Sequence, residues 1–203
     1  TGIGIKYESH RNVIQNNEFF DTVFDWNWDA VYEGQSTGTQ THVTSNGGIR
    51  FFNADQGNSI ARGNIIRRNV FHDLFDGFGV CPWQTTGATT NETDVYENQS
   101  YKMTDDGMET DGLCSNVRIW NNTFHDVLAG ISVAPARVGP VYAIRNIIYR
   151  TGTTLKAPFG GKGPCCGTAF KFQNDEPGSG PIFLFHNIGE GYVQSRGISI
   201  IEP

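Results

Sequence analysis

The chain has 203 residues, a formal net charge of −6, 25 glycines, 12% aromatic residues and only 18% charged residues. This length allows one sizeable domain with its own core, and no run of 18 apolar residues is present that could span a membrane. The acidic charge argues against a nucleic-acid partner, which would need a basic face, and the composition is typical of a turn-rich, all-β extracellular protein.

Two types of short strand alternate from the N-terminus onward. Strands of the first type usually open with Gly, and the copies are 2–5, 48–51, 77–80, 107–110, 130–133, 169–172 and 197–200. Strands of the second type are apolar and carry a recurrent Asn, with copies at 13–19, 65–71 and 117–124 and weaker copies centred on Asn98, Asn146 and Asn187. Strict alternation at a basic period of about 24 residues indicates a β-solenoid.

Alternate residues of each strand are predicted to point inward. One inward column comprises Phe19, Phe71, Phe124 and Ile148, and a second comprises Ile49, Phe78, Met108, Ile131, Phe170 and Ile198. The recurrent Asn is expected at a corner, where its amide can bond the equivalent Asn one coil above and below. The pairs His72-Asp73 and His125-Asp126 follow this Asn within the repeat, so we expect outward residues without a chemical role.

Two insertions, 21–47 and 151–168, interrupt the same corner, between an Asn-type strand and the next Gly-opened strand. The coils between them have short corners, so we expect the insertions to flank a trough over the Gly-opened strands. Four steps between neighbouring strands make this trough roughly 19 Å wide, which is enough for several sugar rings. Trp26 and Trp28 in the first insertion, together with Trp83, are candidates to stack on those rings.

The floor of the trough is predicted to carry an outward column of Arg50, Gly79, Glu109, Ser132 and Lys171. Around this column lies the densest acidic run of the chain, 105–111. Asp76 precedes the strand one coil below this run, and Arg137 follows the strand one coil above it. A Glu within a flat strand is less favoured than one in a loop, so we favour a functional role for Glu109 over a solvated turn.

Clustered carboxylates can perform two kinds of chemistry. Two carboxyl groups with different pKa values supply a general acid and a base for glycoside hydrolysis. Alternatively, several carboxylates hold Ca²⁺, which neutralises a uronate while a Lys or Arg removes a proton. The predicted catalytic residues are Asp106, Glu109, Asp111, Lys171 and Arg137; the predicted substrate-binding residues are Arg50, Asp76, Trp83, Trp26 and Trp28; the predicted Ca²⁺ ligands are Asp105, Asp106, Glu109 and Asp111.

The four cysteines do not have the spacing of a zinc ribbon. Cys81 and Cys114 are candidates for a disulfide between adjacent coils, and Cys165 and Cys166 for a loop staple. Free, half-buried thiols are the alternative.

These repeats resemble the right-handed parallel β-helix (pectate-lyase-like) superfamily, with PbH1-type repeats over nearly the whole chain. The resemblance implies an extracellular polysaccharide lyase, hydrolase or epimerase, or a tailspike-like protein. Part of the chain is similar to the polygalacturonases, whose Asn-Thr-Asp, Asp-Asp and Gly-His-Gly motifs occupy successive coils. Asp76 matches the last residue of the first motif and Asp105-Asp106 matches the second, whereas 128–130 lacks the His of the third and no Arg-Ile-Lys follows.

The sequence thus predicts an all-β, right-handed parallel β-helix of about six coils that forms a single domain over 1–203. No amphipathic helix caps either end, and open solenoid ends expose unpaired strand edges. We therefore expect a piece of a longer chain or assembly, in which further chains or domains cover the ends.

We expect a secreted or cell-surface protein of bacterial origin. Its expected function is polysaccharide processing, by hydrolysis or by lyase chemistry, in the trough. The alternative is a non-catalytic carbohydrate-binding or surface-structural β-helix of the tailspike kind.

Overall fold

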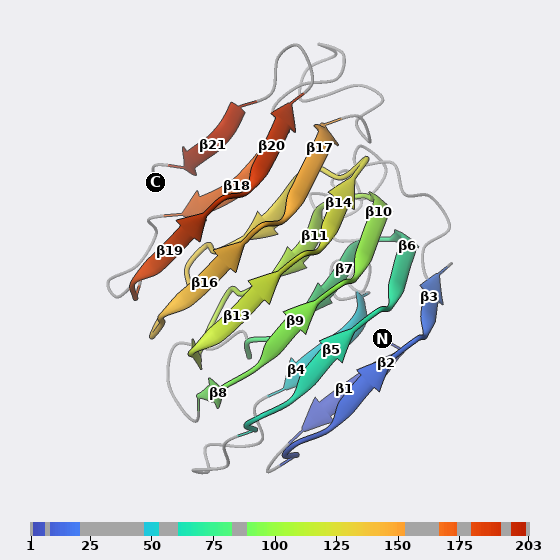
Figure 1. Ribbon diagram of the computed structural model, residues 1–203, viewed down its shortest axis with the longest axis vertical. Helices are drawn as coiled ribbons and strands as arrows, with labels where there is room; N and C mark the ends of the chain where they lie inside the picture. The colour runs from blue at the N-terminus through green and yellow to red at the C-terminus, as the bar shows by residue number, and fades with distance from the viewer. Residues whose placement is uncertain are drawn as a thin grey trace, which may run out of the picture.

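The computed structural model describes residues 2–6, 9–20, 47–52, 61–82, 89–152, 167–173, 180–191 and 196–201. These residues form three long parallel sheets, whose strands stack as successive rungs from the N-terminal β1 to the C-terminal β21 (Figure 1). The described part of the chain contains no helix, and therefore none that could cross a membrane. The predicted all-β parallel solenoid of about six coils is confirmed.

Sheet A contains the strands that open with Gly in the sequence. Every pair of neighbouring strands in it is parallel. Its order is β1 (Ile3–Lys6), β4 (Gly47–Phe52), β7 (Asp76–Gly79), β11 (Asp106–Glu109), β15 (Ala129–Ser132), β18 (Thr168–Gln173) and β21 (Arg196–Ile201).

The Asn-type segments form sheets B and C, which meet at the recurrent Asn. Sheet B runs β2 (Val13–Gln15), β5 (Ile65–Arg67), β9 (Asp94–Tyr96), β13 (Val117–Trp120), β16 (Val141–Ile144) and β19 (Ile182–Phe185). Sheet C runs β3 (Glu18–Phe20), β6 (Val70–Leu74), β10 (Gln99–Met103), β14 (Thr123–His125), β17 (Ile147–Thr151) and β20 (Ile188–Gly191). A separate two-stranded sheet is formed by β8 (Thr90–Asn91) and β12 (Cys114–Ser115), which precede β9 and β13 in the sequence.

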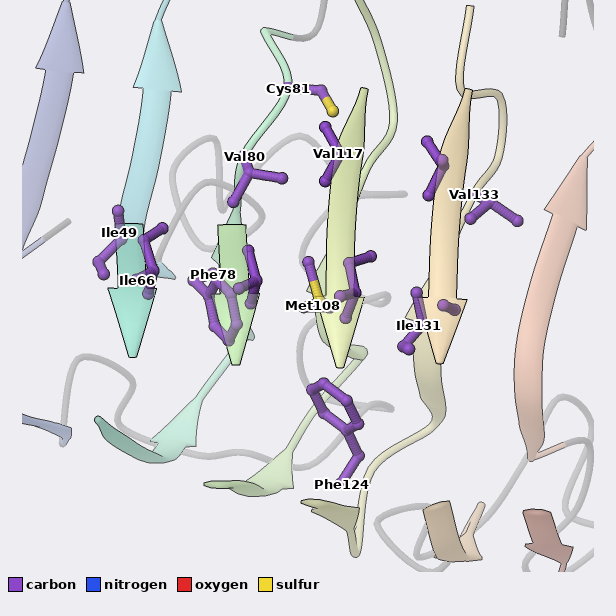
Figure 2. Packing of buried hydrophobic residues seen from close by; sticks show 14 of the residues in the cluster. Ile49, Ile66, Phe78, Val80, Cys81, Met108, Val117, Phe124, Ile131 and Val133 are labelled. Carbon is purple, nitrogen blue, oxygen red and sulfur yellow. The ribbon is translucent and has the colours of Figure 1, made fainter. Parts of the chain in front are cut away.

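The core fills the space between the sheets. Ile49, Phe78, Met108 and Ile131 are fully buried on neighbouring strands of sheet A and point into the same interior (Figure 2). Each such side chain stabilises the fold by about 1.5–3 kcal/mol relative to exposure. The predicted column that begins with Phe19 is also confirmed, because Cα pairing stacks Phe19 on Phe71 and, further up sheet C, Phe124 on Ile148.

A ladder of asparagines forms the corner between sheets B and C, as predicted. The Nδ2 group of each Asn donates to Oδ1 of the next, with N···O distances of 3.0–3.1 Å along Asn17, Asn69, Asn98, Asn122, Asn146 and Asn187. The residue before each of them has a positive φ between 54° and 59°. This left-handed residue turns the chain, and the ladder satisfies the amides that the turn would otherwise leave unpaired.

Glycines recur at the start of the sheet A strands because atoms of the next coil lie too close to leave room for a Cβ. A Cβ at Gly77 would lie 2.1 Å from the carbonyl oxygen of Gly107, and a Cβ at Gly107 would lie 2.6 Å from Cδ1 of Phe124. Gly77 and Gly107 therefore leave no room for a Cβ, whereas Ala169 occupies the equivalent position on β18.

The two His-Asp pairs lie on sheet C, as outward members of the repeat. His72 and His125 stack on either side of Tyr101, with ring centroids 5.0 and 5.1 Å apart. The Nδ1 atom of each ring is 2.6–2.7 Å from the carboxylate of the Asp that follows it. The prediction that these pairs belong to the repeat is confirmed.

Candidate functional site

The outward column predicted for sheet A is confirmed by the register of its strands. Cα pairing joins, from one strand to the next, Arg50, Gly79, Glu109, Ser132 and Lys171. Sheet A therefore presents one acidic and two basic side chains on one face, from three of five successive coils.

Acidic residues from two neighbouring coils meet at the starts of β7 and β11. Asp76 begins β7, and its Oδ1 accepts a hydrogen bond of 3.2 Å from the backbone N–H of Asp106 at the start of β11. One carboxylate oxygen from each of Asp76, Asp106 and Glu109 lies within 4.8 Å of the others. Asp105 directly precedes β11. These four residues form what we call the acidic cluster.

Arg50 reaches into the acidic cluster from β4, two strands below β11. Its Nη2 donates to Oδ2 of Asp76, and its Nη1 donates to Oε2 of Glu109. The guanidinium crosses β7 above Gly79, where an added Cβ would lie 2.7 Å from Nη1. The glycine in the outward column therefore makes room for the arginine.

Lys171 reaches the same cluster from β18, two strands above β11. Its Nζ donates to Oδ2 of Asp106 over 2.5 Å and lies 3.9 Å from Oδ1 of Asp105. Arg50, which was predicted to bind substrate, and Lys171, which was predicted to be catalytic, therefore meet in the same cluster. Both converge on the coil of β11, where protein carboxylates already bind them.

Asp111 lies just beyond β11 in a separate arrangement. The single O–H of Ser132 is shared between the two carboxylate oxygens of Asp111, each 2.8 Å from Oγ, and Oδ1 also accepts a hydrogen bond of 2.7 Å from the backbone N–H of Ala134. The residue is buried. Its bonds hold the end of β11 against the next coil.

Burial dominates the electrostatics of the acids. Removal from water raises the pKa of Asp76 and that of Asp105 well above the usual value of an aspartate, and neighbouring carboxylates raise both further. Burial also raises the pKa of Asp106, against the opposing effect of Lys171. It raises the pKa of Asp111 to about 7. The site therefore contains carboxyl groups that retain protons close to neutral pH.

The pKa of Lys171 is set by two opposing effects. Burial by itself lowers the pKa of its amine, but Asp105, Asp106 and Asp111 together raise that pKa well above the ordinary value of a lysine. The amine therefore stays protonated at neutral pH and acts as a fixed positive charge.

Within the described residues, three buried polar atoms of this region have no hydrogen-bond partner. They are Nε of Arg50, Oδ1 of Asp105 and Oδ1 of Asp106. A buried acceptor without a donor costs about 1–3 kcal/mol, so each of these carboxylate oxygens requires a retained proton, a water molecule or another donor as its partner.

The fit of a calcium ion can be judged from the donors. Asp76, Asp106 and Glu109 supply oxygen ligands, which Ca²⁺ prefers, but Ca²⁺ takes six to eight of them. Each of these three carboxylates already accepts a hydrogen bond from Arg50 or Lys171. The present arrangement therefore does not fit Ca²⁺, and no chemical step below depends on a metal.

The remaining predicted residues contribute less to the site as described. Trp26, Trp28 and Trp83, and most of both insertions, lie outside the described residues. Arg137 lies in the segment after β15, where its backbone N–H donates over 2.9 Å to the carbonyl of Gly112.

A disulfide links the two coils that carry β7 and β11. Cys81 and Cys114 are bonded, with their Cα atoms 5.1 Å apart, which confirms the predicted link between adjacent coils. Cys165 and Cys166 lie outside the described residues.

Two features of the site were not predicted from the sequence. Asp76 was expected only to bind substrate, but it shares Arg50 with Glu109 at the centre of the cluster. Ser132 was placed in the outward column without a role, and it holds Asp111. Residue alternation placed Ser132 on the outward face, but it did not give the partners that Ser132 and Asp76 reach across coils.

Comparison with known proteins identified one matching family model, which is described as a right-handed β-helix region and covers residues 1–168. Neither the curated proteins nor the solved structures gave a match.

Proposed function

This chain belongs to the right-handed β-helix family, and on that premise we propose that it is a glycoside hydrolase that cleaves a polysaccharide bound across the outer face of sheet A. The observation that carries the proposal is that two carboxyl groups of the acidic cluster, those of Asp105 and Glu109, are partly exposed, and burial raises the pKa of Asp105. The side chains of Asp105 and Glu109 are 13% and 15% exposed, whereas those of Asp76 and Asp106 are 2% and 0% exposed. The first two can therefore touch a substrate.

Asp105 is the proposed general acid. Burial and the adjacent Asp106 raise the pKa of its carboxyl group, so that it carries a proton to give to the glycosidic oxygen as the C–O bond breaks. Asp106 and Lys171 lie behind it and position it through their ion pair.

Glu109 is the proposed partner carboxylate. The bond from Nη1 of Arg50 fixes its Oε2, which orients the carboxylate for attack on the anomeric carbon or for activation of a water molecule. If Glu109 activates water, proton donation and attack by that water complete the hydrolysis in one step. If Glu109 attacks instead, water then cleaves the glycosyl ester on Glu109 with Asp105 as the base.

Lyase chemistry is less well supported by the same site. A lyase needs a base that removes a proton next to a uronate carboxylate. The amine of Lys171 has a raised pKa and is paired with Asp106, so it holds its proton and is a poor base.

The experiment is incubation of the protein with a panel of neutral, amino-sugar and uronate polysaccharides, with EDTA present. New reducing ends without new absorbance at the unsaturated-uronate band are expected. Asp105→Asn and Glu109→Gln are each expected to lower the cleavage rate about 10²–10⁴-fold. Asp94→Asn, which removes a carboxylate paired with Arg118 on sheet B, is the matched control and should keep full activity.

New unsaturated-uronate absorbance would replace the hydrolase assignment by a lyase. Equal activity in Glu109→Gln and Asp94→Asn would remove Glu109 from the mechanism.

A non-catalytic carbohydrate-binding or surface-structural module is the second candidate. It is favoured by the internal pairing of the cluster, in which Arg50 and Lys171 bond to protein carboxylates and two of the acids are almost sealed from solvent. Binding of a polysaccharide without new reducing ends or absorbance would identify this function.

The Cys81–Cys114 disulfide supports a secreted or cell-surface location for either function, because disulfides persist in oxidising compartments.

A further inference from the structure

A pocket of about 380 Å³ lies at the corner between sheets B and C. Its volume falls within the range of small-molecule sites. Arg145 and His186 each precede a ladder asparagine on neighbouring coils, and Ile147 and Ile188 each follow one. Sheets B and C form the nearer layer in Figure 1 and sheet A the farther one, so the pocket is separate from the acidic cluster. The residues that line it are Arg145, Asn146, Ile147, His186 and Ile188.

Arg145 gives this pocket a positive charge that is not neutralised within the described part of the chain. The residue is exposed, and its guanidinium has no ion-pair partner among the described residues. The carboxylates of Asp126 and Glu190 act on Arg150. In a chain with a formal net charge of −6, a guanidinium without a carboxylate beside a pocket favours an anion as the ligand.

The same corner position is neutralised lower in the stack. Arg68 and Glu97 also precede ladder asparagines on neighbouring coils, and their side chains form an ion pair. On the two coils of the pocket the corresponding residues are Arg145 and His186, and neither is acidic. A ligand can therefore supply here the negative charge that Glu97 supplies to Arg68.

The pocket offers hydrogen-bond donors that suit an oxyanion. The planar guanidinium of Arg145 can donate two parallel hydrogen bonds to a carboxylate or sulfate group, and the ring of His186 carries an N–H in either tautomer. The backbone beneath them is fixed, because the N–H of Arg145 donates over 3.0 Å to the carbonyl of Phe185. The two donors therefore start from adjacent coils, about 4.8 Å apart.

Two exposed aliphatic side chains complete the pocket. Ile147 and Ile188 pair in register on β17 and β20, and they are 44% and 62% exposed. One coil below, Thr123 occupies the paired position. An apolar surface of two isoleucines beside a guanidinium suits a ligand that has both an anionic group and an apolar face.

We infer that this pocket is a second carbohydrate site, which holds an acidic sugar away from the proposed catalytic face. Arg145 and His186 bind the carboxylate or sulfate group of the sugar, and Ile147 and Ile188 contact the C–H face of its ring. The inference goes beyond the proposed function, which supports only the choice of a sugar as the carrier of the anion.

The test is calorimetric binding of three hexasaccharides: a galacturonate oligomer, a sulfated galactose oligomer and a neutral galactose oligomer. EDTA and about 0.15 M salt are present, so that attraction between distant surface charges is screened. The protein is the full chain, as wild type, Arg145→Asn and the control Arg68→Asn. Asparagine tolerates the left-handed backbone of both positions, as Asn16 and Asn121 show at equivalent points of the repeat.

At least one acidic hexasaccharide is expected to bind more tightly than the neutral one, and the stronger of the two identifies the anion. Arg145→Asn should weaken that binding about tenfold or more, as for loss of a charge-assisted hydrogen bond. Arg68→Asn removes the same charge from the same backbone position and should leave binding unchanged. Ile147→Thr should weaken it about fivefold through lost apolar contact.

Three results would overturn the inference. The first is equal binding of acidic and neutral hexasaccharides, and the second is an equal loss in Arg145→Asn and Arg68→Asn. The third is tighter binding, lost in Arg145→Asn, of a short peptide with a free carboxylate and an apolar last residue, which would assign the pocket to a protein terminus.

Failure of the inference can be separated from failure of the proposed function. If the acidic hexasaccharide binds through Arg145 but no polysaccharide yields reducing ends, the hydrolase proposal fails and the second site stands. If reducing ends appear and Arg145→Asn binds every hexasaccharide as the wild type does, the hydrolase proposal stands and the second site is wrong.

Discussion

Asp111 makes the stability of this fold depend on pH in a direction that the structure determines. Burial raises the pKa of its carboxyl group from 3.8 to about 7 in the folded chain. Between these values the folded state binds the proton and the unfolded state releases it. The unfolded state therefore binds fewer protons, and the free energy of unfolding falls as pH rises.

The size of this effect follows from the shift in pKa. A difference of about three units corresponds to about 4 kcal/mol, present in full below pH 4 and lost as pH rises through 7. Roughly 2.5 kcal/mol of this loss falls between pH 5 and pH 8 by the linkage relation.

Asp111→Asn tests this reasoning, because an amide keeps an acceptor for the N–H of Ala134 and a hydrogen-bonding group for Ser132 but does not ionise. Urea unfolding of wild type and variant at pH 5 and pH 8 measures the free energy of unfolding. Relative to wild type, the variant should gain about 2.5 kcal/mol between these two pH values. Asp94→Asn controls for the change in net charge. A difference between wild type and Asp111→Asn that does not change with pH would refute the assignment of a buried, proton-retaining carboxyl group.

Three further predictions concern the architecture. Gly79→Ala should leave the circular dichroism spectrum unchanged but reduce polysaccharide cleavage about tenfold or more, because the added Cβ would displace the Arg50 guanidinium that crosses β7. Gly77→Ala should fail to fold, because its Cβ would meet the backbone of the next coil. Equal effects of the two substitutions would contradict this reasoning. Asn122→Ala removes the partners of several buried amide groups and should lower the free energy of unfolding in urea by about 3 kcal/mol or more; a loss below about 1 kcal/mol would show that the ladder is not stabilising. The Cys81–Cys114 disulfide closes a loop across 33 residues, so its reduction should lower the free energy of unfolding by about 3–4 kcal/mol on the chain-entropy account. Urea unfolding with and without dithiothreitol measures this difference.

Much of the fold was predictable because a solenoid repeats the same contacts along the chain. The spacing of Asn69, Asn98, Asn122 and Asn146 gave the positions of one corner, and the hydrogen bonds between them confirm it. Alternation in strands of only a few residues then gave the buried face, as Phe78 shows. In such a fold a residue's neighbours lie one period away, so sequence periodicity is almost equivalent to a contact map.

The candidate site was predictable in position but not in its interactions. Alternation placed Arg50, Glu109 and Lys171 in one outward column, and the register of sheet A confirms that placement. The sequence also assigned Arg50 to substrate binding and Lys171 to catalysis. In the folded chain Arg50 and Lys171 both extend over two strands to bond to Glu109 and Asp106 of β11, which strand spacing alone does not predict.

The sequence by itself determined the repeat, the coil order and the face on which the acidic run lies, because these depend on periodicity and on side-chain alternation. Only the tertiary structure decided which charges meet. The long side chains of Arg50 and Lys171 pair with carboxylates up to two coils away. Burial between coils raises the pKa of Asp76, Asp105 and Asp106. The ion pairs and the pKa values depend on three-dimensional distances and on the exclusion of water, and neither can be deduced from the residue order within one strand.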